Sequence, residues 1–94
     1  MHVSICVITF RLFGIDSLKT KRSQIKPLLK RLPTQFNVAV AEIDGHDSYQ
    51  TAVICLVNVG VDSGRLHSQH EKAVAWIEKT RPDLRIENYS IEFR

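Results

Sequence analysis

The chain has 94 residues, of which 44% are hydrophobic and 24% charged, and its net charge is +3. This length fits one domain, residues 1–94, and excludes a second hydrophobic core, while the composition excludes a disordered chain. No apolar run approaches the roughly 18 residues that span a bilayer, and the opening segment lacks the basic start and the small-residue cleavage site of a signal peptide, so we expect a cytoplasmic protein without membrane contact.

The first predicted element is a strand at residues 3–12, VSICVITFRL, which is apolar on both alternating faces. Such a strand is central in its sheet and covered on both sides. Gly14 ends the run, and Asp16 or Ser17 can cap a helix. Pro27 lies opposite the apolar stripe of this helix and should bend or split it. The stripe consists of Leu18, Ile25, Leu29, Leu32 and Phe36.

Residues 37–44, NVAVAEID, alternate like an edge strand, and Asp44-Gly45 indicates a turn. Residues 51–59, TAVICLVNV, are apolar on both faces and predict a second central strand. A second helix, capped by Asp62 or Ser63, follows and stops at Pro82. Residues 84–93, LRIENYSIEF, alternate and predict a second edge strand. The core stripe of the second helix is Leu66, His70, Ala73 and Ile77, flanked by Val74 and Trp76.

The predicted order is therefore βαββαβ, an α+β domain of the ferredoxin-like class. Two central and two edge strands imply an antiparallel sheet of order 4-1-3-2 with both helices on one face. The helix-free face then carries apolar side chains that a monomer leaves in water. We expect self-association, as a dimer or larger homo-oligomer, to cover this face.

Three segments together resemble the small bacterial family of unknown function called YlxP-like: the opening MHV, SLKTKR at residues 17–22, and FNVAVAEIDGHDSYQTAV at residues 36–53. The resemblance covers nearly the whole chain. It implies a ferredoxin-like fold, an oligomeric state, and a gene that often neighbours translation-initiation and ribosome-maturation genes. The family has no established catalytic residue. The chain departs from the family at Pro33, where the family more often has a basic residue. The proline therefore shortens the basic part of the helix at its end.

The first predicted helix is strongly basic, with six Lys or Arg residues and no carboxylate between Ser17 and Pro33. Cations at a helix N-terminus oppose the macrodipole, whereas an anion is attracted both by them and by the free N–H groups. These residues permit binding of a polyanion, and the gene neighbourhood implied by the YlxP-like resemblance favours an accessory, non-enzymatic protein that binds structured, ribosomal RNA or a ribosome-associated partner. An equally weighted alternative to RNA binding is that these lysines form an ordinary solvated surface of the helix. The predicted nucleic-acid-binding residues are Lys19, Lys21, Arg22, Lys26 and Lys30.

An acidic segment, with Glu42 and Asp44 on one strand face followed by His46 and Asp47, has three interpretations. These side chains could hold a divalent ion. They could be turn-forming residues and edge charges that block aggregation, or they could pair with the basic helix of a second subunit. Because the spacing matches no defined metal loop, we expect neither a metal nor another cofactor.

Other residues and motifs argue against specific classes of protein function. Cys6 and Cys55 are expected to be buried reduced thiols, and His70 a packed core residue rather than a metal ligand paired with His67. The third strand has no aromatic residue, which excludes an RNA-recognition motif. The loop after the first strand has only one glycine, which argues against a hydrolase of phosphate esters or acyl phosphates. The competing class is a homo-oligomeric interaction module that docks a protein by its open sheet face or acidic hairpin.

Overall fold

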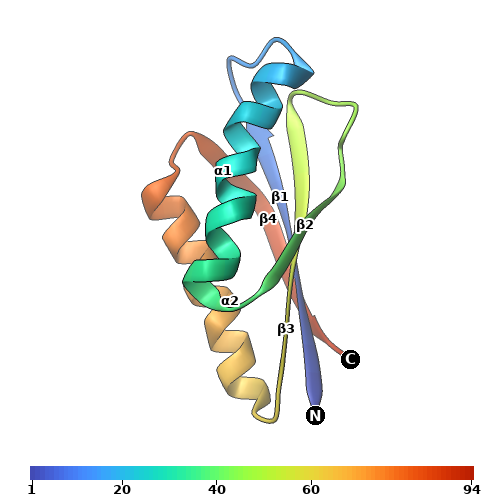
Figure 1. Cartoon of the computed structure of the whole chain (residues 1–94), viewed down its shortest axis with the longest axis vertical. Coiled ribbons are helices and arrows are strands. Elements are labelled where there is room, and N and C mark those ends of the chain that lie inside the picture. Colours follow the sequence, from blue (N-terminus) through green and yellow to red (C-terminus); the bar gives the residue numbers. More distant parts are fainter.

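The computed structural model describes all residues, 1–94, and shows two helices packed on one face of a four-stranded sheet (Figure 1). Both chain ends lie at the same end of the sheet, where the backbones of Val3 and Arg94 exchange two hydrogen bonds of 2.9 and 2.8 Å. The βαββαβ order is confirmed. The elements are β1 (His2–Leu12), α1 (Leu18–Phe36), β2 (Ala39–Asp44), β3 (Thr51–Gly60), α2 (Ser63–Thr80) and β4 (Leu84–Phe93).

The sheet has the order β2-β3-β1-β4 with every pair antiparallel, which is the predicted 4-1-3-2 order read from the opposite edge. The predicted ferredoxin-like fold is thus confirmed. Because the two central strands pair in register, with Cys6 opposite Leu56 and Ile8 opposite Ile54, the same parity of each strand faces the helices. The buried residues of β1 and β3 on this side form the floor of the core: Cys6, Ile8, Phe10, Leu12, Ala52, Ile54 and Leu56.

The helices close the core from one side. α1 contributes Ile25, Leu28 and Leu32, so its buried stripe is centred on Leu28 rather than on the predicted Leu29, which is only partly buried. The two residues are neighbours on the helix, and a small rotation about its axis exchanges their burial. The predicted stripe of α2 is confirmed, because its buried residues are Leu66, His70, Ala73, Val74 and Ile77.

Both ends of α1 are capped as their residue types require. The Ser17 side chain accepts a 3.1 Å hydrogen bond from the Thr20 N–H, and Asn37 ends the helix in the left-handed region at φ 51°. Pro27 and Pro33 both lie inside this helix, which continues without a break to Phe36. The prediction that Pro27 could split the helix is wrong; it lies on the exposed side, where the lost hydrogen bond can be replaced by water.

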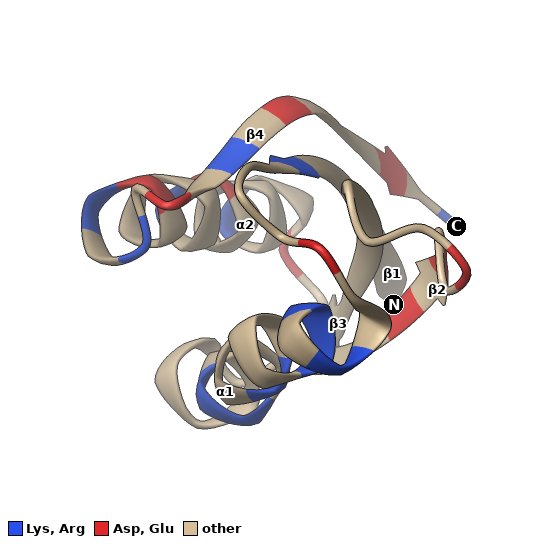
Figure 2. Ribbon diagram, turned by 90° about the horizontal axis from the view of Figure 1, so that it is seen from above, with Lys and Arg blue, Asp and Glu red and all other residues tan.

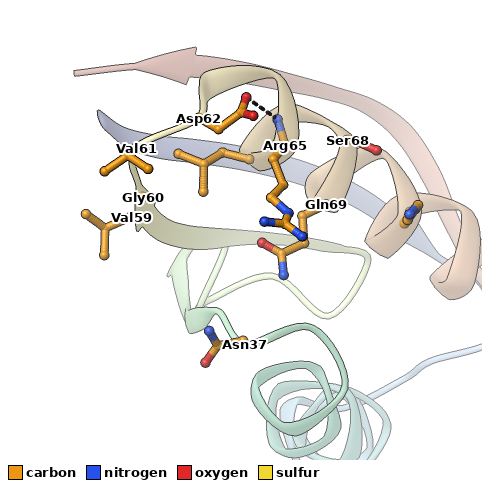
Figure 3. A pocket seen from close by; sticks show the side chains of 10 residues that line it. Asn37, Val59, Gly60, Val61, Asp62, Arg65, Ser68 and Gln69 are labelled. Carbon is orange, nitrogen blue, oxygen red and sulfur yellow. Dashed lines mark hydrogen bonds between the residues drawn. The ribbon is translucent and has the colours of Figure 1, made fainter. Parts of the chain in front are cut away.

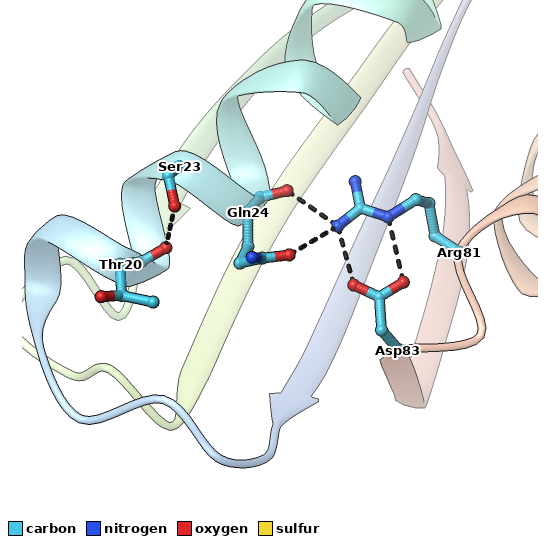
Figure 4. A network of polar contacts seen from close by, with 5 residues as sticks. All are labelled: Thr20, Ser23, Gln24, Arg81 and Asp83. Atoms are coloured by element: carbon cyan, nitrogen blue, oxygen red, sulfur yellow. Dashed lines mark hydrogen bonds and ion pairs between the residues drawn. The ribbon is translucent and has the colours of Figure 1, made fainter.

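Arg81, just after α2, joins the two helices to the start of β4 (Figure 4). Its Nη2 donates to the Gln24 carbonyl at 3.0 Å, and its Nε and Nη2 donate to the two carboxylate oxygens of Asp83 at 3.0 and 2.8 Å. The guanidinium lowers the pKa of Asp83 below its ordinary value through these hydrogen bonds. A second contact between the helices is the Arg31 guanidinium, 5.0 Å from the centre of the Trp76 ring. Neither helix is long and apolar enough to cross a membrane.

Candidate nucleic-acid interface

Four of the five predicted nucleic-acid-binding residues form one exposed strip on α1, here called the basic flank: Lys19, Arg22, Lys26 and Lys30. Their spacing places them on one side of the helix. The opposite side faces α2, because Gln24 and Arg31 contact Arg81 and Trp76 there. No member of the basic flank forms an ion pair or a side-chain hydrogen bond. Figure 2 shows this concentration of Lys and Arg on α1.

Lys21, the fifth predicted residue, does not belong to this strip. It is 2% exposed, and its ammonium lies 3.0 Å from a carboxylate oxygen of Glu42 on β2. The ammonium also donates to the carbonyls of Gly45 and Ser48 at 2.6 and 2.7 Å. With two hydrogen bonds, one ion pair and only 2% of its surface exposed, Lys21 is not available to a phosphate. Lys21 lies four residues before the buried Ile25, so helical spacing places both on the same side of α1. This spacing in the sequence could have indicated that Lys21 faces inward.

The turn that receives Lys21 depends on a glycine. Gly45 adopts φ +77°, and a Cβ built there would lie 3.0 Å from the Thr51 carbonyl oxygen. Only glycine fits both conditions without strain. The preceding Asp44 accepts a 2.7 Å hydrogen bond from the Gly45 N–H, which confirms the predicted Asp44-Gly45 turn. The β2–β3 turn is therefore held against α1 by one buried lysine.

The acidic segment is not one cluster. A bulge at Ile43 shifts the register, so Glu42 lies opposite Ile54 while Asp44 lies opposite Val53. Facing residues share a face, and Ile54 and Val53 point to opposite faces. The expectation that Glu42 and Asp44 share a face is therefore wrong. Glu42 pairs with Lys21 of its own chain, which replaces the interpretation in which Glu42 pairs with a second subunit. No group of three or more His, Cys, Asp or Glu residues lies close enough to hold a metal ion.

A groove of about 500 Å³, which no sequence pattern predicted, lies between the β3–α2 turn, α2 and the end of α1. Arg65 and Gln69 reach from α2 into this groove, toward Asn37 at the end of α1 (Figure 3). Lys72 also lines it. The spacing of Arg65, Gln69 and Lys72 places them on one side of α2, but nothing in the sequence indicated that Asn37 faces them.

Beneath α2 lies a small buried polar group in an apolar setting. Ser4 on β1 faces Asn58 on β3, and His70 of α2 is fully buried. The hydroxyl of Ser4 and both ring nitrogens of His70 have no hydrogen-bond partner. Burial lowers the pKa of His70, although a backbone group of Ser4 counteracts part of this effect. The expectation that His70 is a packed core residue is confirmed, although its ring forms no hydrogen bond.

The helix-free face, here called the open face, is mainly aliphatic at its centre, with polar residues toward the Arg11–Thr51 end of β1 and β3 and on β4. It carries the odd-numbered residues of β1 and β3, and none of the strand residues on it is aromatic. Cys55 lies near its centre, opposite Val7 and Ala41, whereas Cys6 points into the core. Burial raises the pKa of both thiols, that of Cys6 to about 12, so neither is a ready thiolate. Stacking of bases, as on RNA-recognition motifs, has no platform on this face.

Comparison with known proteins gives relatives without an assigned activity. The family model described as a protein of unknown function, DUF503, matches residues 3–91. The "Uncharacterized protein YlxP" of Bacillus subtilis (strain 168) is 27% identical over 73 residues, which cover 78% of this chain and 75% of that protein. A crystal structure described as a dimeric protein of unknown function and ferredoxin-like fold, from Bacteroides fragilis NCTC 9343, is 11% identical. It superposes with a TM-score of 0.47 over 99% of this chain and 94% of that one.

Proposed function

We propose that this chain, which belongs to the DUF503 family of proteins of unknown function, binds structured RNA through the basic flank of α1. One observation carries the proposal: the four exposed cations of this flank lie together without a carboxylate partner, while Lys21, the cation between them, is turned inward. An exposed lysine usually gains little from a surface ion pair. A run of cations with no counter-charge at all is suited to a polyanion.

The position of the flank on the helix strengthens this proposal. Lys19 and Arg22 lie in the first turns of α1, and no acidic residue occupies the first turn. The helix macrodipole is positive at this end, so the two cations and the dipole repel one another in the free protein. A phosphate placed there interacts favourably with both. From Lys19 to Lys30 the flank extends about 16 Å along the axis, enough for more than one phosphate.

The absence of aromatic side chains on the flank decides which kind of RNA fits. Single-stranded RNA is held largely by stacking of its bases on aromatic rings. The flank offers Lys and Arg alone, so it contacts phosphates and recognises the shape of a folded or double-stranded RNA. This favours a structured RNA, such as a ribosomal helix, and predicts little dependence on base sequence.

The test is the salt dependence of binding to ribosomal RNA fragments. For the wild type we expect the log of the affinity to fall linearly with log salt, with a slope of about −0.7 to −0.9 per neutralised phosphate. The triple variant Lys19→Gln, Lys26→Gln, Lys30→Gln should bind more weakly to every fragment, with a slope shallower by about two to three. Glutamine keeps the helix propensity, so the fold should survive.

A matched control carries the same change in net charge elsewhere. Lys79, Arg85 and Arg94 are exposed residues outside α1. Their replacement by glutamine should leave most of the salt slope in place. If the control loses as much affinity as the flank variant, or if the wild type shows no salt-sensitive binding, the basic flank is only a solvated surface.

A second function is favoured by the open face. Aliphatic side chains of three strands form rows across it, with Ala41, Cys55 and Val7 in one row and Ala39, Val57 and Ile5 in the next. Monomeric proteins rarely leave such a continuous apolar surface in water. We propose that a second copy of the chain covers it. The two proposals are compatible, because the basic flank and the open face lie on opposite sides of the sheet.

A further inference from the structure

The groove at the N-terminal end of α2 has a polar lining that is rich in hydrogen-bond donors. Arg65 and Lys72 are cations without an ion-pair partner. Asn37 and Gln69 each bring a side-chain amide, and Ser68 a hydroxyl. The ends of Arg65 and Gln69 lie side by side in the groove, and Asn37 lines it from the end of α1 (Figure 3). Groups that can only donate, or can donate as well as accept, suit a ligand rich in acceptor oxygens.

The orientation of Gln69 is held by a buried side chain. Asn58, 7% exposed on β3, donates a 2.9 Å hydrogen bond from Nδ2 to Oε1 of Gln69. This bond turns Oε1 of Gln69 toward Asn58, and the amide nitrogen of Gln69, which forms no other hydrogen bond, can donate into the groove. A buried partner that fixes a lining side chain is typical of a binding site whose geometry is set in advance.

Asp62 is the one carboxylate in the lining, and its side chain caps α2. Its Oδ1 accepts a 3.1 Å hydrogen bond from the Arg65 backbone N–H, which caps α2. The groove therefore contains two cations and one carboxylate, whose negative charge is partly offset by the positive end of the α2 dipole. The net charge of the groove is positive.

An apolar ledge borders these donors. Val59, which lies on the open-face side near the end of β3, and Val61, just after β3, are 62% and 88% exposed, and both line the groove at this edge of the sheet. A free inorganic anion would make no use of this ledge. A phosphate attached to an organic group could place the anion among the donors and the organic part against the two valines.

We propose that this groove binds the phosphate group of a nucleotide, with the phosphate at Arg65, Gln69 and Lys72 and the sugar or base against Val59 and Val61. The nucleotide could be free or the terminal unit of an RNA chain, since both present the same chemistry. The groove lies between α2 and the end of α1, whereas the basic flank faces away from α2. The inference is therefore independent of RNA binding by that flank.

The test is an NMR titration of the whole ¹⁵N-labelled chain with uridine 5′-monophosphate, inorganic phosphate, uridine and octauridylate. We expect the monophosphate to shift the side-chain amide signals of Gln69 and Asn37 in a saturable way. Inorganic phosphate should do so several-fold more weakly, because it leaves the valine ledge unused, and uridine should not bind. In the basic-flank variant Lys19→Gln, Lys26→Gln, Lys30→Gln, where that flank no longer contributes, tighter binding of octauridylate than of the monophosphate identifies the terminus of an RNA chain as the source; the reverse identifies a free nucleotide.

Paired variants show whether the named cations carry the binding. Arg65→Gln with Lys72→Gln should weaken monophosphate binding about tenfold or more, because charge-assisted hydrogen bonds to the phosphate are lost. The control Lys79→Gln with Arg85→Gln has the same charge change and should bind like the wild type. The basic-flank variant should also retain monophosphate binding, so the two proposals fail separately. No saturable shift with any phosphate, or equal binding by the paired cation variant and its control, would overturn the inference.

Discussion

Lys21 illustrates how one side chain can change its role between the sequence and the folded chain. It lies among exposed cations in the sequence, yet in the structure its ammonium is enclosed by Glu42 and by the carbonyls of Gly45 and Ser48. Desolvating an ammonium is costly, and only complete replacement of its water by acceptors makes the burial tolerable. The lysine thus works as a clamp between α1 and the β2–β3 turn.

At this scale we predict that Lys21→Met lowers the free energy of unfolding by about 3 kcal/mol, because it leaves Glu42 and two carbonyls without their buried partner. Urea unfolding measures this loss. Hydrogen exchange of the turn amides near Gly45 and Ser48 should also become faster. Lys26→Met, on the exposed flank of the same helix, is the control and should change stability by no more than about 0.5 kcal/mol. A loss below 1 kcal/mol for Lys21→Met would show that the clamp is dispensable.

At the scale of elements, α1 is stable in spite of its composition. It has two internal prolines, no acidic residue in its first turn and no basic residue in its last. An internal proline cannot donate to the carbonyl four residues earlier and crowds the preceding turn. The helix is therefore held by its packing, through Ile25, Leu28 and Leu32, and by its caps rather than by intrinsic propensity.

Replacing Pro27 by alanine should raise the free energy of unfolding by about 2 kcal/mol. The gain of about 3 kcal/mol from helix propensity and the restored hydrogen bond to the Ser23 carbonyl is partly offset, because the more flexible chain gains entropy when unfolded. Thermal or urea unfolding measures the change. Lys26→Ala, at the neighbouring exposed position, should have almost no effect. A destabilised Pro27→Ala would mean that the proline shapes a bend that the packing of α1 needs.

At the scale of the whole molecule, the notable feature is that the uncovered face of the sheet is largely apolar, whereas a solvated sheet face is usually polar. The two helices bury one face, and the open face presents valine, isoleucine, alanine and Cys55 across three strands. The edge strand β4 differs, since it adds polar residues to this face, among them Ser90 and Glu92 opposite Val7 and Ile5. An apolar patch with a polar border is the arrangement common at protein interfaces.

We expect the wild-type chain to be a dimer or larger assembly that covers the open face, and Val57→Lys to convert it to a folded monomer. A charge at the centre of the apolar rows has to be buried in the assembly, which costs several kcal/mol. Light scattering after size exclusion measures the mass. Ser90→Lys, on the polar border of the same face, should remain associated.

The accessibility of Cys55 gives an independent readout of the same surface. Its thiol should react slowly with a maleimide in the wild type and faster in Val57→Lys, while Cys6 stays inert in both because it is fully buried. A wild-type monomer at high micromolar concentration, or equal labelling of Cys55 in both proteins, would contradict this expectation.

The sequence by itself determined the order of the elements and the central and edge positions of the strands, and it narrowed each helix N-cap to two neighbouring candidates, from which the structure selected Ser17 and Asp62. These features depend on local periodicity and on side chains that act on their own backbone, so they can be read without knowing the neighbours. The exposed basic flank could be predicted for the same reason, because helical spacing alone places Lys19, Lys26 and Lys30 together.

Only the tertiary structure decided which polar residues meet. The bulge at Ile43 put Glu42 and Asp44 on opposite faces, and a one-residue change of register of this kind leaves no periodic signal. The burial of Lys21 required the carbonyls of a turn more than twenty residues away, and the groove required Asn37 of one helix end to face Arg65 of another. Each of these contacts depends on the packing of distant elements, which the pattern within one segment does not encode.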